Sequence, residues 1–95
     1  MELKLILKLI CTTTAIREEL VKSNTRKEEV VNARFLFFHF ANRYSNSDYK
    51  QISKYVNRSD KTYFYALKMV QQYRKYDRDF KAIYETINNQ LSLML

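Results

Sequence analysis

Apolar residues recur at three- and four-residue intervals along most of this chain, with charged and polar residues between them. The pattern is clearest in two neighbouring stretches, 49–56 and 59–70, whose apolar positions are Tyr49, Ile52 and Val56, then Tyr63, Ala66, Leu67 and Val70. This spacing gives a helix one apolar face. Only Asn57 and Arg58 separate the two stretches. The pattern therefore predicts two helices joined by a tight turn, a helix-turn-helix over about residues 48–75.

The same periodicity predicts helices on both sides of this pair. Apolar stripes suggest helices over residues 3–10, 15–22 and about 26–44, and a last helix that begins at Asp77 or Asp79. The chain contains no Gly and no Pro, which favours uninterrupted helices over hairpin-rich sheets. We expect an all-α fold of about six helices, with residues 1–95 forming a single domain.

Hydroxyl side chains indicate where several of these helices begin. Thr14, Thr25, Ser47 and Ser59 each precede an apolar-periodic stretch and are predicted to cap it. Thr25 is followed three residues later by Glu28, the spacing of a capping box.

The helix over about 26–44 is apolar nearly all round in its middle, residues 35–41. Such a helix is covered by neighbours on several sides. We expect the single histidine, His39, to be a core or rim residue with a hydrogen-bonded partner rather than a catalytic base. Arg34 and Arg43 are charged exceptions, which we expect to reach solvent or a phosphate.

Charge favours a polyanionic partner. The net charge is +7 while 46% of residues are hydrophobic, which is typical of a folded basic protein rather than a disordered tail. Between Lys50 and Lys75 there are seven basic residues and one acid, Asp60. At 100° per residue, the second helix of the pair turns Lys61, Tyr65, Lys68 and Gln72 away from its apolar side. This basic, aromatic face is the candidate DNA reader.

Composition excludes several kinds of site. Phosphate-binding loops of the Walker and dinucleotide types need glycine, which excludes an ATPase site and a Rossmann-type nucleotide site. We also expect no nucleotide, no cofactor and no enzymatic activity. One cysteine, Cys11, and one histidine are too few for a zinc site and allow no internal disulfide. The apolar stretch 3–10 is interrupted by Lys4 and Lys8 and is too short to span a bilayer. A role for it at a membrane surface remains open, but core packing is expected. The expected compartment is the cytoplasm.

Four segments follow one another in a recognisable order. They are Leu20-Val21-Lys22-Ser23-Asn24-Thr25-Arg26, Val30-Val31-Asn32-Ala33-Arg34, Ser47 with Ile52-Ser53-Lys54-Tyr55-Val56, and Arg58-Ser59-Asp60-Lys61-Thr62-Tyr63-Phe64-Tyr65-Ala66. In this order they resemble the C-terminal DNA-binding domain of the bacterial replication initiator DnaA, which is all-helical and related in fold to the Trp repressor. The resemblance covers most of the chain, from about residue 9 to residue 91.

The resemblance implies roles for individual residues. It implies that Arg26 enters the minor groove, that Arg34 holds a phosphate, and that Arg58, Lys61 and Thr62 read base edges in the major groove. We add Tyr65 as a further base contact and expect three lysines to neutralise phosphates: Lys50, Lys54 and Lys68.

The chain departs from the family at the positions that should decide specificity. Ser59 and Asp60 stand where the family has Asp and His, Lys61 replaces a Thr, and Tyr65 replaces a His. A one-residue shift would instead match Asp60 to the family Asp, which could accept a hydrogen bond from a cytosine amino group. The resemblance therefore implies DNA binding more firmly than any particular target. The resemblance does not extend to the ATPase module of the initiator.

The resulting hypothesis is a stand-alone, sequence-preferring double-stranded DNA-binding domain that acts in replication initiation or its regulation. One alternative is a transcription regulator of a phage or mobile element, located in the host cytoplasm and typically a homodimer. Another is a helical interaction module that binds a replication protein and no DNA. A composition rich in Lys, Asn, Tyr and Ile without Gly or Pro hints at an AT-rich source.

Overall fold

The computed structural model describes all of residues 1–95 and contains six helices and no strand. In chain order the helices are α1 (Leu3–Thr14), α2 (Glu18–Lys22), α3 (Glu28–Tyr44), α4 (Tyr49–Tyr55), α5 (Asp60–Tyr76) and α6 (Arg78–Leu93). The all-α prediction is confirmed. None of the helices combines the length and the apolar composition that a bilayer crossing would require.

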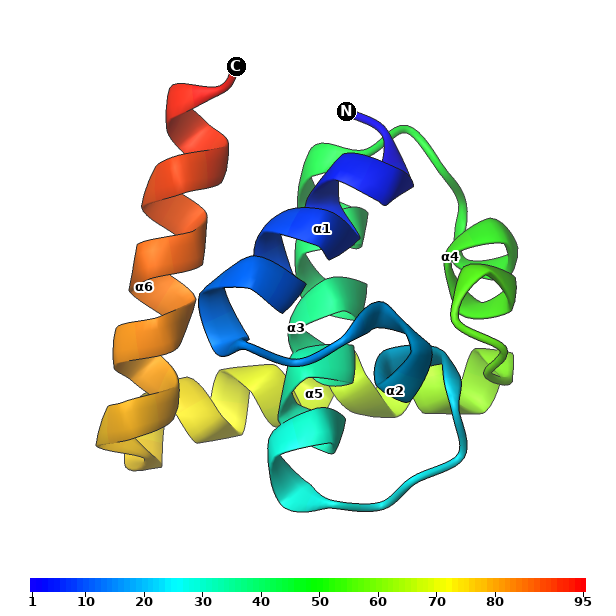
Figure 1. The fold of residues 1–95 in the computed structure, drawn as a ribbon, viewed down its shortest axis with the longest axis horizontal. Helices are drawn as coiled ribbons and strands as arrows, with labels where there is room; N and C mark the ends of the chain where they lie inside the picture. Colours follow the sequence, from blue (N-terminus) through cyan, green and yellow to red (C-terminus); the bar gives the residue numbers. More distant parts are fainter.

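Helix α3 is the centre of the molecule, and it packs against each of the other five helices. Figure 1 shows it upright in the middle, with α1 crossing in front of it, α6 along one side and α5 running nearly at right angles to it. Every residue from 33 to 41 is buried, as the apolar run predicted. Because α3 is enclosed on all sides, it fixes α2, α4 and α5 relative to one another.

A single hydrophobic core contains residues from all six helices. Its aromatic part contains Phe37, Phe38, Phe40 and Tyr84. His39 is buried beside them, and its Nε2 lies 2.6 Å from the hydroxyl of Tyr84. The expectation of a buried, hydrogen-bonded histidine is confirmed.

Burial lowers the pKa of His39 to about 4, and the nearby charges of Arg74 and Arg43 add to the effect. The guanidinium of Arg74 lies 3.9 Å from the centre of the Tyr84 ring. The imidazole is therefore neutral at pH 7 and serves the core rather than acid–base chemistry.

Helix α1 is longer than expected, and the prediction that Thr14 caps α2 is wrong. The helix continues through all three threonines, and the Thr14 hydroxyl donates to the Ile10 carbonyl at 2.7 Å. A threonine hydroxyl that bonds back to the preceding turn can remain inside a helix. Ala15, in the left-handed conformation with φ of 59°, ends it.

Two other caps are also wrong. Thr25 accepts a hydrogen bond from the amide of Lys27 in the loop, and α3 begins after Lys27 without a side-chain cap. Asp48, not Ser47, caps α4 and forms a reciprocal capping box with Gln51. The predicted cap of α5 is confirmed, since the Ser59 hydroxyl accepts from the amide of Thr62. At the last helix, Asp77 accepts from the amide of Phe80.

Candidate nucleic-acid interface

Helices α4 and α5 form the predicted helix-turn-helix. At the turn, Asn57 has a φ of 58°, a conformation that asparagine tolerates better than most residues other than glycine. The Asn57 side-chain amide donates to the carbonyl of Lys22 at 3.2 Å, and the amide of Arg58 donates to the carbonyl of Ser53 at 2.9 Å. The turn is therefore fixed both to α4 and to the end of α2.

The two faces of α5 are arranged as the spacing predicted. Tyr63, Ala66 and Val70 are buried in the core. The outward side chains are exposed at Lys61, Tyr65, Lys68 and Gln72, and Phe64 lies exposed among them. The ring of Tyr65 meets Phe35 of α3 edge-on with 5.9 Å between centroids. The outward face is thus basic and aromatic, with Tyr65 held against the central helix.

Arg34 was expected to reach solvent or a phosphate. It does not reach solvent, because only 4% of the residue is exposed. Its Nε donates to the carbonyl of Val21 at 2.8 Å, and one Nη donates to that of Ser23 at 3.0 Å. Longer bonds, of 3.3 to 3.4 Å, reach the carbonyls of Leu20 and Thr25. The guanidinium therefore holds the loop between α2 and α3 from inside.

Arg58 is tied to the same loop. Its guanidinium donates to the carbonyl of Ser23, which also accepts from Arg34, and to the carbonyl of Asn57. Burial, and to a smaller extent the charge of Arg58, lowers the pKa of Arg34 to about 10. With this pKa, the Arg34 guanidinium remains charged at pH 7. The predicted base reader Arg58 is thus half-buried and partly engaged within the protein.

These bonds bring the α2–α3 loop beside the start of α5. The two segments line a polar hollow formed by Asn24, Thr25, Arg26, Arg34, Arg58 and Thr62. None of these residues carries a negative charge. Arg26 and Thr62, which are 36 positions apart in the sequence, therefore lie in one concave, cationic surface suited to an anionic ligand.

Comparison with known proteins identifies the family of this chain. The family described as the bacterial dnaA protein helix-turn-helix matches residues 3–70, which include α1 to α4 and the first part of α5. The chain belongs to the DnaA helix-turn-helix family. The predicted resemblance is confirmed.

Two named relatives support the assignment. A chromosomal replication initiator protein DnaA from Flavobacterium psychrophilum is 37% identical over 76 residues, covering 79% of this chain and 16% of that protein. The DnaA of Bacteroides thetaiotaomicron is 29% identical over 87 residues, covering 90% of this chain and 18% of that protein. The chain thus spans less than one fifth of the length of these relatives.

The remaining predicted site residues of this DnaA-family domain are on the surface. Lys50 and Lys54 are exposed on α4, and the Lys50 ammonium lies 5.9 Å from the centre of the Tyr49 ring. Ser59 and Asp60 are exposed at the start of α5. Exposure leaves all four side chains accessible to a ligand.

Phe64, which is 54% exposed on the outward face of α5, was not among the predicted site residues. An apolar residue between two tyrosines would ordinarily be expected to lie in the core. A signal was nevertheless present, because Phe64 lies three residues after Lys61 and four before Lys68. That spacing places the three side chains on one side of a helix.

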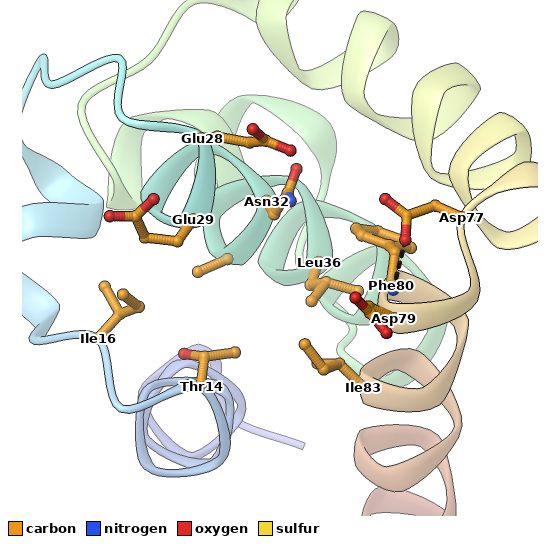
Figure 2. Close-up of a pocket in the computed structure, with 11 residues that line it drawn as sticks. Thr14, Ile16, Glu28, Glu29, Asn32, Leu36, Asp77, Asp79, Phe80 and Ile83 are labelled. Atoms are coloured by element: carbon orange, nitrogen blue, oxygen red, sulfur yellow. Dashed lines mark hydrogen bonds between the residues drawn. The ribbon is translucent and has the colours of Figure 1, made fainter.

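A different hollow, at the other end of α5, has the opposite character. Figure 2 shows carboxylates from the first turn of α3 and from the α5–α6 corner around it: Glu28, Glu29, Asp77 and Asp79. Its floor includes Leu36, Phe80 and Ile83. Negative charge makes this hollow unsuitable for a phosphate backbone. No group of three or more His, Cys, Asp or Glu side chains is placed to hold a metal ion.

Proposed function

We propose that this DnaA-family domain binds double-stranded DNA with a preference for certain sequences, placing α5 in the major groove. The observation that carries the proposal is the attachment of the α2–α3 loop to the start of α5 through the Ser23 carbonyl. This attachment sets the exposed cation of Arg26 beside the exposed face of α5. A duplex lying across both would meet basic groups in two adjacent grooves.

The side chains divide into three roles in this proposal. Lys61, Thr62 and Tyr65 contact base edges, together with the free part of the Arg58 guanidinium and the first residues of α5, Ser59 and Asp60. Three exposed lysines neutralise phosphates and set the register: Lys50, Lys54 and Lys68. Arg26 probes the minor groove. Arg34 takes a different role from the one that the resemblance implied, and acts by holding the loop that carries Arg26.

The relatives are named as chromosomal replication initiators, and we propose a role in replication initiation or its control, in the cytoplasm. Residues 1–95 would act as one DNA-binding unit. The role needs no bound cofactor and no catalytic step in these residues.

Selection from randomised duplex DNA, followed by fluorescence anisotropy with the selected duplex, tests the proposal. The logarithm of the association constant should fall linearly with the logarithm of salt concentration, by about 0.9 per phosphate neutralised. Failure to enrich any sequence, with weak binding that is equal for all duplexes, would refute sequence preference. Absence of binding even at low salt would refute the function itself and favour a protein-interaction module.

Two lysines provide matched variants. Lys61→Ala should weaken binding to the selected duplex by roughly 1–3 kcal/mol and relax the preference at one base pair. Lys54→Ala should weaken binding to all sequences alike and reduce the salt slope by about one. Equal losses on every sequence from both variants would contradict the division between base readers and phosphate contacts.

A further inference from the structure

Phe64 is an apolar ring set in the middle of a basic surface. It is 54% exposed, and Lys61 and Lys68, one turn before and one turn after it on the same side of α5, are exposed as well. A single exposed apolar side chain is ordinary, but contiguous exposed apolar surface often marks a binding site. Phe64 is contiguous with the ring of Tyr49, which is itself 38% exposed, and it lies in the second turn of the candidate reading helix.

Two aromatic rings pack against Phe64, and the rest of its ring is exposed. The Tyr63 ring meets it at 87° with 5.0 Å between centroids, and the Tyr49 ring of α4 lies 5.3 Å away. Tyr63 is itself buried, and its hydroxyl donates to the side chain of Asn42 at 2.8 Å. The buried, hydrogen-bonded Tyr63 therefore limits the side-chain freedom of Phe64, so less of that freedom is lost when a ligand covers the ring.

The surroundings favour DNA over a protein as the occupant. The cores of protein interfaces are depleted in lysine, whereas Phe64 lies between two exposed lysines. The major groove offers one purely apolar group on its base edges, the C5-methyl group of thymine.

Resting on the proposed function, we infer that Phe64 packs against a thymine methyl group and makes thymine the preferred base at one position of the target. Lys61 and Lys68 flank this contact by binding neighbouring base edges or phosphates. The apolar contact thus adds a base preference that charged side chains alone do not supply.

Uracil substitution tests the inference, since uracil lacks the methyl group but keeps the hydrogen-bonding edge of thymine. Each thymine of the selected duplex is replaced singly by uracil, and affinity is measured by anisotropy. For the unmodified protein, one replacement should weaken binding about threefold to fivefold, as burial of one methyl group predicts. Phe64→Ala should bind the thymine duplex correspondingly less tightly and show no difference between thymine and uracil at that position.

Two further variants complete the design. Phe64→Leu keeps an apolar side chain and should retain part of the thymine preference. Lys68→Ala should weaken binding to the thymine and uracil duplexes by the same factor. Thermal melting by circular dichroism checks each variant, and if Phe64→Ala is unfolded, Phe64→Leu carries the test through a reduced thymine-to-uracil ratio.

Failure of this inference is distinguishable from failure of the proposed function. If the unmodified protein binds the duplex tightly but tolerates uracil at every position, or if the selected site has no thymine, Phe64 does not read a methyl group. A folded Phe64→Ala that keeps the full thymine preference overturns the inference as well. If the unmodified protein binds no duplex, the proposed function fails, and this inference fails with it.

Discussion

Arg34 offers the sharpest test of how this domain is built. The residue is almost fully buried, and its guanidinium donates to the carbonyls of four residues between positions 20 and 25. Arg34→Met keeps much of the volume but removes every donor. Each hydrogen bond to a charged group contributes about 1.5–3 kcal/mol, although loop carbonyls that lose the guanidinium can partly turn to water. We expect a loss of about 3–5 kcal/mol in the free energy of unfolding, comparable with the removal of one partner from a buried ion pair.

Urea unfolding followed by circular dichroism measures this loss, and Arg34→Lys is the matched control. Lysine keeps the charge but has a single ammonium group that cannot span four carbonyls. The loss in the free energy of unfolding from Arg34→Lys should therefore lie between zero and the loss from Arg34→Met. The expected shift in melting temperature for Arg34→Met exceeds about 12 °C, at 4–8 °C per kcal/mol for a domain of this size.

Salt dependence separates the structural role of Arg34 from a phosphate contact. If Arg34 only holds the loop, Arg34→Met should be less stable and, where it is still folded, should bind DNA more weakly with the same salt slope as the unmodified protein. If Arg34 is instead a full-strength phosphate contact, Arg34→Met should keep nearly the same stability and lower the slope by about 0.9. An Arg34→Met protein that melts normally and shows the lower slope would refute the reasoning from burial.

Two further outcomes are expected from the core and the turn. The pKa of His39 is about 4 in the folded protein against about 6.5 when unfolded, so the unfolded chain binds the extra proton first as pH falls. The free energy of unfolding should drop by about 2 kcal/mol between pH 7 and pH 5, and the drop should be smaller in His39→Gln, because glutamine does not titrate. At the turn, Asn57→Ala should cost about 1–2 kcal/mol because alanine disfavours positive φ, and Asn57→Gly should cost less. Equal losses from the two substitutions would locate the cost in the lost hydrogen bond to Lys22 instead.

The spacing of apolar residues was sufficient to predict the helices, because the regularly spaced apolar side chains are the ones that become buried. The inward residues of α5 and the enclosed middle of α3 both follow from spacing and composition, and the turn at Asn57 follows from its place between two apolar stripes. A family resemblance then identified the motif. None of these inferences needed a contact between residues distant in the sequence.

The cap of α4 was missed although spacing indicates it, whereas the burial of Arg34 depends on information that spacing does not contain. Ser47 and Asp48 are adjacent and both can cap, but only Asp48 is followed three residues later by a capping-box partner, Gln51. The sequence does not reveal that Arg34 is buried, because its partners are backbone carbonyl groups, which every residue has. The backbone of residues 20–25 becomes a ligand for the guanidinium only when the loop folds back over α3.

The Ser23 carbonyl, shared by two guanidinium groups, bears on how this domain could be re-engineered. A designer who transplanted α4 and α5 alone onto another scaffold would leave Arg58 without its acceptor and would lose the Arg26 loop. The portable unit instead runs from α2 through the end of α5, and α3 in its middle supplies the rigid support. Within that unit, an insertion between Ser23 and Thr25 should be tolerated least, because the carbonyls of both residues accept hydrogen bonds from Arg34.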